Sequence, residues 1–149
     1  MSAVEVIVGE SLIDPSAEAA KLSAGADDDC GAIAMFCGVV RGGEVTAMTL
    51  EHYPEMTKSA LYDIALAAAK KWELKTARII HRTGRMTPGE VIVFVGASSS
   101  HRSSAFSACS YMTDYLKTRA PFWKKEETSS GSRWVEAKPE DEEARRRWE

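Results

Sequence analysis

The sequence predicts an α+β fold with a mainly antiparallel or mixed sheet and flanking helices. Apolar runs bounded by turn residues follow one another in pairs, as in hairpins, and alternating strand–helix crossovers are the minority. Segments with apolar residues at helical spacing stand between these pairs. At 149 residues, the chain is most simply one domain, residues 1–149, with room for a substantial core.

The first third of the chain predicts a strand, a short helix and a hairpin. Residues 4–9 (VEVIVG) are rich in β-branched side chains, which favours a strand. Residues 14–24 begin with Asp-Pro, a candidate N-cap followed by the residue preferred at the first helical position. Residues 30–41 are apolar and residues 45–53 alternate, so the Gly-Gly-Glu turn between them predicts a hairpin.

The middle of the chain predicts a long helix and two further strands. Residues 54–72 open with proline and carry apolar side chains at helical spacing, which makes this the most strongly indicated helix. Residues 76–84 and 91–100 are apolar runs typical of strands. Residues 85–90 (RMTPGE) contain Pro-Gly and predict the turn between these strands.

The last third predicts a second long helix, a second hairpin and a charged end. Helix 102–118 stops before Pro121, which disfavours helical backbone in the residue preceding it. Residues 121–128 alternate, and residues 130–137 are their expected hairpin partner. Residues 138–149 are acidic first and basic last, which suits the helix dipole, although the sequence leaves open whether this helix is well ordered.

Composition and charge exclude several classes of protein. The chain has 19 Lys and Arg against 22 Asp and Glu, a net charge of −3, so bulk attraction to nucleic acid or anionic membranes is not expected. No apolar run approaches the roughly 18 residues that a membrane helix needs. The N-terminal segment lacks a basic region followed by an apolar one, so we expect no secretory signal and a cytoplasmic protein.

The three cysteines, Cys30, Cys37 and Cys109, are widely spaced and form no metal-ligand pattern with the histidines. We therefore favour free thiols and expect no metal and no metal cofactor. A catalytic thiol at Cys37 is a minority alternative, since no His or Asn stands near it in sequence. The serines form no GxSxG elbow, and no pair of clustered carboxylates predicts a glycosidase-type hydrolase.

Basic residues gather at the start of helix 102–118. The sequence SSSHR stands between a strand and this helix, where backbone N–H groups together with His101 and Arg102 could bind an anion. The alternative is that Ser99 or Ser100 caps the helix and Arg102 is solvated. The stretch by itself does not decide between these two interpretations.

The end of the same helix carries Lys117, a common position for lysine because it complements the helix dipole. Lys124 follows shortly after, in an extended segment. There Phe122 and Lys124 point to one face, and Trp123 and Lys125 point to the other. One lysine can therefore lie beside Lys117 next to an aromatic wall, where each charge would lower the pKa of the other. Such a lysine can act as a general base, general acid or nucleophile.

A third basic element is Arg41, at the end of strand 30–41 and beside Gly-Gly. Its alternative role is that of a solvated hairpin arginine. In the segment LEHYPEM, a buried and hydrogen-bonded His52 is favoured over a ligand, and Glu51 could pair with one of these basic groups.

Four stretches then resemble a known family: LEHYPEMTKSAL, IIHRTGRMTPGEVIVFVGASSSHRSSAF, YLKTRAPFWKKE and RWVEA. They are similar to the catalytic (large) subunit of molybdopterin synthase, over nearly the whole chain from about residue 31 to residue 148. The resemblance implies an α/β hammerhead fold and a central homodimer of large subunits. A small ubiquitin-like sulfur carrier docks at each end of this dimer, which makes a heterotetramer.

The resemblance also implies an activity. The carrier's C-terminal Gly-Gly, activated as a thiocarboxylate, enters a pocket of the large subunit. Its sulfur is transferred there to cyclic pyranopterin monophosphate, and two transfers form the dithiolene of molybdopterin. Both reactants are anions, which a local basic pocket in an acidic protein would serve. Metal is added later by other enzymes, so no cofactor is expected in this subunit.

Carried over to this sequence, the resemblance implies that Lys117 and Lys124 are catalytic. Our hypothesis is that Lys117 handles proton transfer and the carrier's terminal carbonyl. Lys124 would hold the pterin intermediate or assist opening of the cyclic phosphate. The residues expected to bind substrate are Arg41, His101, Arg102, Lys125 and Glu126. The family's site lies near the dimer interface, so some of these groups can come from the partner subunit.

The sequence departs from the family pattern in two places. Val39 replaces the lysine of a common GKVR motif, and the loop 42–44 is short, which puts substrate contacts from that loop in doubt.

Three rival functions remain open. They are a non-catalytic anion-binding or partner-binding subunit of the same complex, a single-strand nucleic-acid binder using Phe122 and Trp123, and a thiol sulfurtransferase using Cys37.

Overall fold

The structure is a computed structural model that describes residues 3–136 and 138–149. Its strands and helices are, in chain order, β1 Ala3–Gly9, α1 Pro15–Ala24, β2 Ala32–Val39, β3 Val45–His52, α2 Pro54–Lys71, β4 Thr76–Arg82, β5 Gly84–Met86, β6 Val91–Ser99, α3 Arg102–Arg119, β7 Phe122–Thr128, β8 Gly131–Val135 and α4 Pro139–Arg146. Ala137, which the predicted strand 130–137 includes, lies outside the described residues.

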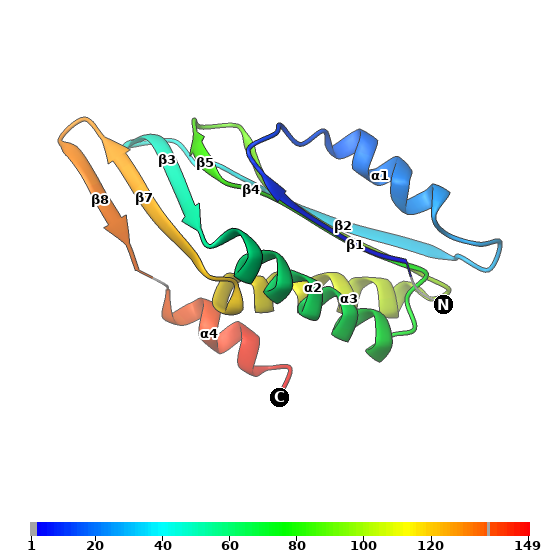
Figure 1. The fold of residues 1–149 in the computed structure, drawn as a ribbon. Helices are drawn as coiled ribbons and strands as arrows, with labels where there is room; N and C mark the ends of the chain where they lie inside the picture. Colours follow the sequence, from blue (N-terminus) through cyan, green and yellow to red (C-terminus); the bar gives the residue numbers. More distant parts are fainter. Residues whose placement is uncertain (1–2, 137) are drawn as a thin grey trace.

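The strands form two four-stranded sheets, with orders β1-β4-β6-β2 and β5-β3-β7-β8. Only the β1–β4 pair is parallel among the described strand pairs. In Figure 1, α1 covers one face of the first sheet, α2 and α3 run along the other face, and the second sheet extends from one end. The predicted α+β class with a mixed, mainly antiparallel arrangement is therefore confirmed, and so is the β7–β8 hairpin.

The predicted hairpin between residues 30–41 and 45–53 is wrong. β2 pairs with β6 in the first sheet, whereas β3 pairs with β5 and β7 in the second. Each strand buries its apolar face in a different core: Ala34 of β2 belongs to the main core, and Met48 of β3 belongs to a smaller one. The Gly-Gly turn thus marks where the chain passes between sheets, because turn residues report a change of direction and not a pairing.

The predicted turn 85–90 is also partly wrong, since its first two residues belong to the short strand β5. Gly84 has a φ of +82°, a conformation that glycine adopts without steric cost. Gly84 is the first residue of β5, which follows β4 after Thr83 alone, and β5 then pairs with β3 through Met48 and Met86. One chain segment thereby joins the two sheets.

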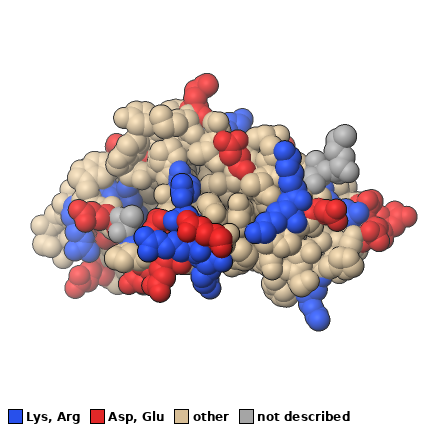
Figure 2. Space-filling model, turned by 90° about the horizontal axis from the view of Figure 1, so that it is seen from below, with Lys and Arg blue, Asp and Glu red and all other residues tan. Residues whose placement is uncertain are grey.

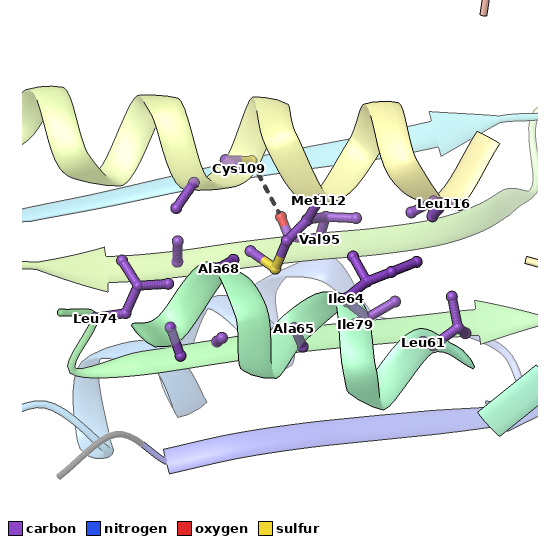
Figure 3. Packing of buried hydrophobic residues seen from close by; sticks show 14 of the residues in the cluster. Leu61, Ile64, Ala65, Ala68, Leu74, Ile79, Val95, Cys109, Met112 and Leu116 are labelled. Atoms are coloured by element: carbon purple, nitrogen blue, oxygen red, sulfur yellow. Dashed lines mark hydrogen bonds between the residues drawn. The ribbon is translucent and has the colours of Figure 1, made fainter. Parts of the chain in front are cut away.

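The main core lies between the first sheet and the helices α2 and α3 (Figure 3). The apolar stripe predicted for residues 54–72 is the buried face of α2, with Leu61, Ile64 and Ala68 packed against the sheet. Met112 of α3 is fully buried, and the Cys109 thiol lies 3.7 Å from the carbonyl oxygen of Val95 on β6. Packing of this kind holds α3, and therefore both of its ends, in a fixed position along the sheet.

The C-terminal helix α4 is docked on α3. Trp148, which follows this helix, donates a 2.7 Å hydrogen bond from Nε1 to Asp114, and Arg147 forms a 3.2 Å ion pair with the same carboxylate. The Trp148 ring also contacts Trp72 and Tyr111, with centroids 5.6 Å apart in both pairs.

In the described part of the chain, none of the helices has the length and hydrophobicity needed to span a bilayer.

Candidate active site

A cavity of about 290 Å³ opens where the C-terminal end of α3 meets β7 and the segment that leads into α4. Its lining includes Lys117 from α3 and both Phe122 and Lys124 from β7. Gly38 and Val39 at the end of β2 also line it. The cavity therefore lies at the junction of the two sheets, beside the last turn of the long helix.

The predicted meeting of two lysines beside an aromatic wall is confirmed. The helix ends at Arg119, and Ala120 has extended backbone angles, so the chain turns before Pro121 and enters β7. Alternation along β7 then directs Phe122 and Lys124 to the cavity. The residue types and their spacing were sufficient to predict this arrangement because only a short turn separates the helix from the strand.

Burial lowers the pKa of the Lys117 ammonium below its ordinary value of 10.5. The charges of Lys124 and Lys138 lower the same pKa further, whereas the Asp141 carboxylate opposes the shift by raising it. At a given pH, a larger fraction of Lys117 is therefore in the neutral amine form than of a solvated lysine. A lysine in this condition can accept a proton or attack a carbonyl carbon.

His81 of β4 is a site residue that the sequence analysis missed. It lines the cavity, is only 5% exposed, and stacks on Phe122 with ring centroids 4.1 Å apart. Its Nδ1 lies 2.9 Å from the carbonyl oxygen of Arg82, so the proton must be on Nδ1 for this hydrogen bond to form. Burial lowers the pKa of His81 to about 4, and the neutral ring keeps Nε2 as an acceptor.

The segment around α4 supplies three further charged residues that line the cavity: Glu136, Lys138 and Asp141. The sequence predicts only a charged C-terminal helix in this region. Nothing in the local sequence indicates that it folds back over the lysines, because its position depends on contacts with α3 such as the Trp148–Asp114 hydrogen bond.

The two residues that follow Lys124 in the predicted substrate-contacting run do not point into the cavity. Lys125 points to the opposite face of β7, where its Nζ stands 5.8 Å from the centre of the Trp134 ring. Glu126 forms a 3.3 Å ion pair with Arg133 of β8. Neither residue is among those that line the cavity around Lys117.

The predicted anion-binding residues are not brought to the lysines within one chain. His101 and Arg102 are exposed at the first turn of α3. At roughly 1.5 Å per residue, the helix from Arg102 to Lys117 spans about 22 Å. Arg41 is also exposed, two positions beyond the cavity-lining Val39.

The serines before α3 do not cap it through their side chains. Ser99 Oγ accepts a 3.2 Å hydrogen bond from the backbone N–H of His101, and Ser100 Oγ donates to Asp29. The N-cap residue is His101, without a side-chain cap bond. The first turn of α3 therefore has no side-chain cap and begins beside two exposed basic side chains, which is compatible with the anion-binding interpretation.

The structure also bears on the catalytic thiol and the nucleic-acid surface that the sequence leaves open as rival functions. Burial raises the pKa of the Cys37 thiol, which disfavours the reactive thiolate, and Cys37 packs against the apolar cluster of Leu22, Ile80 and Phe94. Within residues 3–136 and 138–149, no group of three His, Cys, Asp or Glu side chains is arranged for a metal ion. Figure 2 shows basic and acidic side chains intermixed on the face seen from below, without a continuous basic stripe among the described residues.

The chain is similar to known proteins over most of its length. The family model described as MoaE protein matches residues 8–119. The molybdopterin synthase catalytic subunit of Pseudomonas aeruginosa is 51% identical, with 95% of this chain and 97% of that protein covered. The Salmonella typhimurium protein of the same name is 47% identical, with 99% and 100% covered.

A solved structure gives the same result in three dimensions. The molybdopterin biosynthesis MoaE protein from Burkholderia ambifaria superposes with a TM-score of 0.83 at 45% identity. The superposition covers 99% of this chain and 98% of that one. The chain therefore belongs to the MoaE protein family.

Proposed function

We propose that this chain is the catalytic subunit of molybdopterin synthase. It would transfer sulfur from the C-terminal thiocarboxylate of a small ubiquitin-like carrier to cyclic pyranopterin monophosphate, forming the dithiolene of molybdopterin. The observation that supports this most directly is that Lys117 and Lys124 line one cavity. Relatives named molybdopterin synthase catalytic subunit, one of them 51% identical, support the same function.

The cavity suits two anionic reactants. The ammonium of Lys124 attracts a phosphate or a thiocarboxylate, and the partly apolar walls strengthen that attraction by excluding water. Lys117, whose pKa is lowered by burial, would take up a proton and engage the carrier's terminal carbonyl. Lys124 would hold the pterin intermediate or assist opening of the cyclic phosphate.

The five residues expected to bind substrate lie outside the cavity lining of their own chain. Arg41, His101 and Arg102 would clamp the phosphate, for which guanidinium groups provide bidentate hydrogen bonds. Because Arg102 lies about 22 Å along α3 from Lys117, we assign His101 and Arg102 to the site of the partner subunit in a homodimer. Lys125 and Glu126 follow Lys124 on β7 and would orient this strand, Glu126 through its ion pair with Arg133.

The complex we propose is a heterotetramer with two copies of this chain at the centre and one carrier at each end. The carrier's Gly-Gly tail would enter the cavity, because glycine has no side chain to exclude it from a narrow space. We propose a cytoplasmic location and no resident cofactor, since acid–base groups and cations suffice for the transfer.

A reconstituted reaction tests this function. Purified chain is mixed with thiocarboxylated carrier and cyclic pyranopterin monophosphate, and the dithiolene product is followed as its oxidised fluorescent derivative. Product formation that depends on all three components supports the proposal. Carrier binding without product would instead favour the alternative, a non-catalytic partner-binding subunit.

A further inference from the structure

Part of the cavity lining is a row of residues across three strands of the first sheet. His81 of β4 is paired with Val93 of β6, and Val93 is paired with Gly38 of β2. All three line the cavity, and we call this row the cavity floor. Lys117 reaches the same cavity from α3, which packs against β6 and β2. The cavity thus lies between the floor and the end of α3.

His81 is the only polar side chain that the first sheet contributes to the described lining. The residues of this sheet that line the cavity are Gly38, Val39, His81, Ile92 and Val93. A ring with two nitrogens that is only 5% exposed in such surroundings is costly unless its nitrogens have hydrogen-bond partners. The position of His81 therefore requires an explanation for each nitrogen.

One of the two nitrogens has a partner in the protein. Nδ1 donates to the carbonyl oxygen of Arg82, 2.9 Å away. Within residues 3–136 and 138–149, the only fully enclosed side-chain nitrogen or oxygen without a partner is Nε of Arg82. Nε2 of His81 makes no hydrogen bond to these residues either, so protein atoms do not enclose it. Its lone pair therefore reaches the cavity.

Two contacts fix the direction in which Nε2 points. The ring stacks on Phe122, with centroids 4.1 Å apart and planes at 22°, and the bond from Nδ1 to Arg82 sets the rotation of the ring in its plane. Phe122 and Arg82 belong to strands β7 and β4. An acceptor that is already oriented loses little conformational freedom when a ligand binds to it.

The acceptor complements the other groups of the cavity. Lys117 and Lys124 in their ammonium forms only donate hydrogen bonds. Burial lowers the pKa of His81 to about 4, so Nε2 is an uncharged acceptor that does not repel an anion, unlike the lining carboxylates of Glu136 and Asp141. This combination matches a ligand that carries both an anionic oxygen or sulfur and an N–H group.

We propose that Nε2 of His81 accepts a hydrogen bond from an N–H group of a reactant, which makes His81 a further residue that positions substrate. The inference rests on the proposed function, because both reactants come from it. Two sources have the required N–H group: a backbone amide of the carrier's Gly-Gly tail and the ring of the pterin. A reactant that displaces water from Nε2 must supply a donor in its place, or the buried acceptor is left unpaired.

Three substitutions separate this role from a purely structural one. His81→Asn keeps a donor at the Nδ1 position and has no acceptor at the Nε2 position, whereas His81→Gln places an amide oxygen at the Nε2 position and gives up the Nδ1 donor. Both lose the stack on Phe122, so a structural role predicts that Gln is no better than Asn. His81→Phe keeps the stack and lacks the acceptor.

Equilibrium binding of each reactant alone identifies the source of the N–H group. Titration calorimetry measures one Kd for a carrier that ends in an ordinary Gly-Gly carboxylate and another for cyclic pyranopterin monophosphate. We expect one of these Kd values to rise about 10-fold in His81→Asn and His81→Phe and to stay within about 3-fold of the wild type in His81→Gln. A change for the carrier assigns the tail amide, and a change for the pterin assigns its ring.

His52→Asn is the matched control. The His52 ring also contacts Phe122, with centroids 6.1 Å apart, but His52 is not among the residues that line the cavity. Both Kd values should therefore stay unchanged in this variant. Circular dichroism checks that each variant is folded, and His81→Phe carries the test if His81→Asn does not fold.

The outcomes distinguish the inference from the proposed function. Unchanged Kd values in the folded variants that lack the acceptor would overturn the inference, and so would equal losses in His81→Gln or in His52→Asn. Product formation by the wild type in the reconstituted reaction would leave the proposed function standing in those cases. A wild type that binds through His81 but forms no product would overturn the proposed function alone, and one that binds neither reactant would overturn both.

Discussion

The buried histidine in the cavity wall makes a quantitative prediction about stability. The pKa of His81 falls from an ordinary 6.5 to about 4, chiefly because burial disfavours the charged ring. The unfolded chain therefore binds more protons than the folded chain between these two values. Stability must rise with pH across this window and decline as the pH falls from 6.5 toward 4.

The size of the effect follows from the two pKa values. Between pH 7 and pH 5, the linkage relation gives a loss of about 2 kcal/mol in the free energy of unfolding from this one group. Asp29, Glu90 and Glu149 have lowered pKa values, so the stability they contribute is lost only below this interval. The interval from pH 5 to pH 7 thus isolates His81 from these carboxylates.

Urea unfolding of the wild type and of His81→Asn at pH 7 and pH 5 measures the difference. Asparagine keeps an N–H donor for the Arg82 carbonyl but does not titrate in this range. The variant is expected to be less stable at pH 7, because it loses the stack on Phe122, and to lose about 2 kcal/mol less than the wild type on acidification. Equal pH dependence in the two proteins would refute the assignment of a buried, neutral His81.

Two further predictions concern the residues that the C-terminal segment brings to the site. Asp141→Asn removes the carboxylate that raises the pKa of Lys117. If the rising limb of the pH–rate profile reports deprotonation of Lys117, this limb should move to lower pH in the variant. A limb that stays in place or moves to higher pH would contradict the charge arrangement. In Trp148→Ala, the loss of two aromatic contacts and one hydrogen bond should reduce the free energy of unfolding by about 2 kcal/mol and expose α4 to trypsin. The exposed Trp134→Ala should have little effect in both assays, and equal effects of the two tryptophan substitutions would mean that α4 is not held as described.

The parts of the fold that could be predicted are those governed by short-range spacing. The apolar periodicity of residues 54–72 predicts helix α2. The helix stop before Pro121, together with alternation along β7, predicts that Lys124 lies on the same side as Lys117. The pairing of β2 with β6 could not be predicted, because it joins residues about 60 positions apart and depends on which core each strand enters. Local turn chemistry favours the neighbouring strand instead.

The same distinction applies to the site. Lys117 and Lys124 are close in sequence and were identified together. His81 and Asp141 reach the cavity from β4 and α4 through tertiary packing, and neither has a local motif that indicates a site. An isolated histidine within the apolar run IIHR was the one available signal, since burying such a side chain requires a specific hydrogen-bond partner.

The central claim is that the two lysines of one cavity perform the sulfur transfer. Single-turnover product formation should be compared for the wild type, Lys117→Ala, Lys124→Ala and the exposed α2 control Lys70→Ala, with carrier binding measured in parallel. We expect a loss of at least about 100-fold in each cavity variant, the scale of a missing acid–base group, with carrier still bound and Lys70→Ala unaffected. Wild-type rates in both Lys117→Ala and Lys124→Ala would contradict the account.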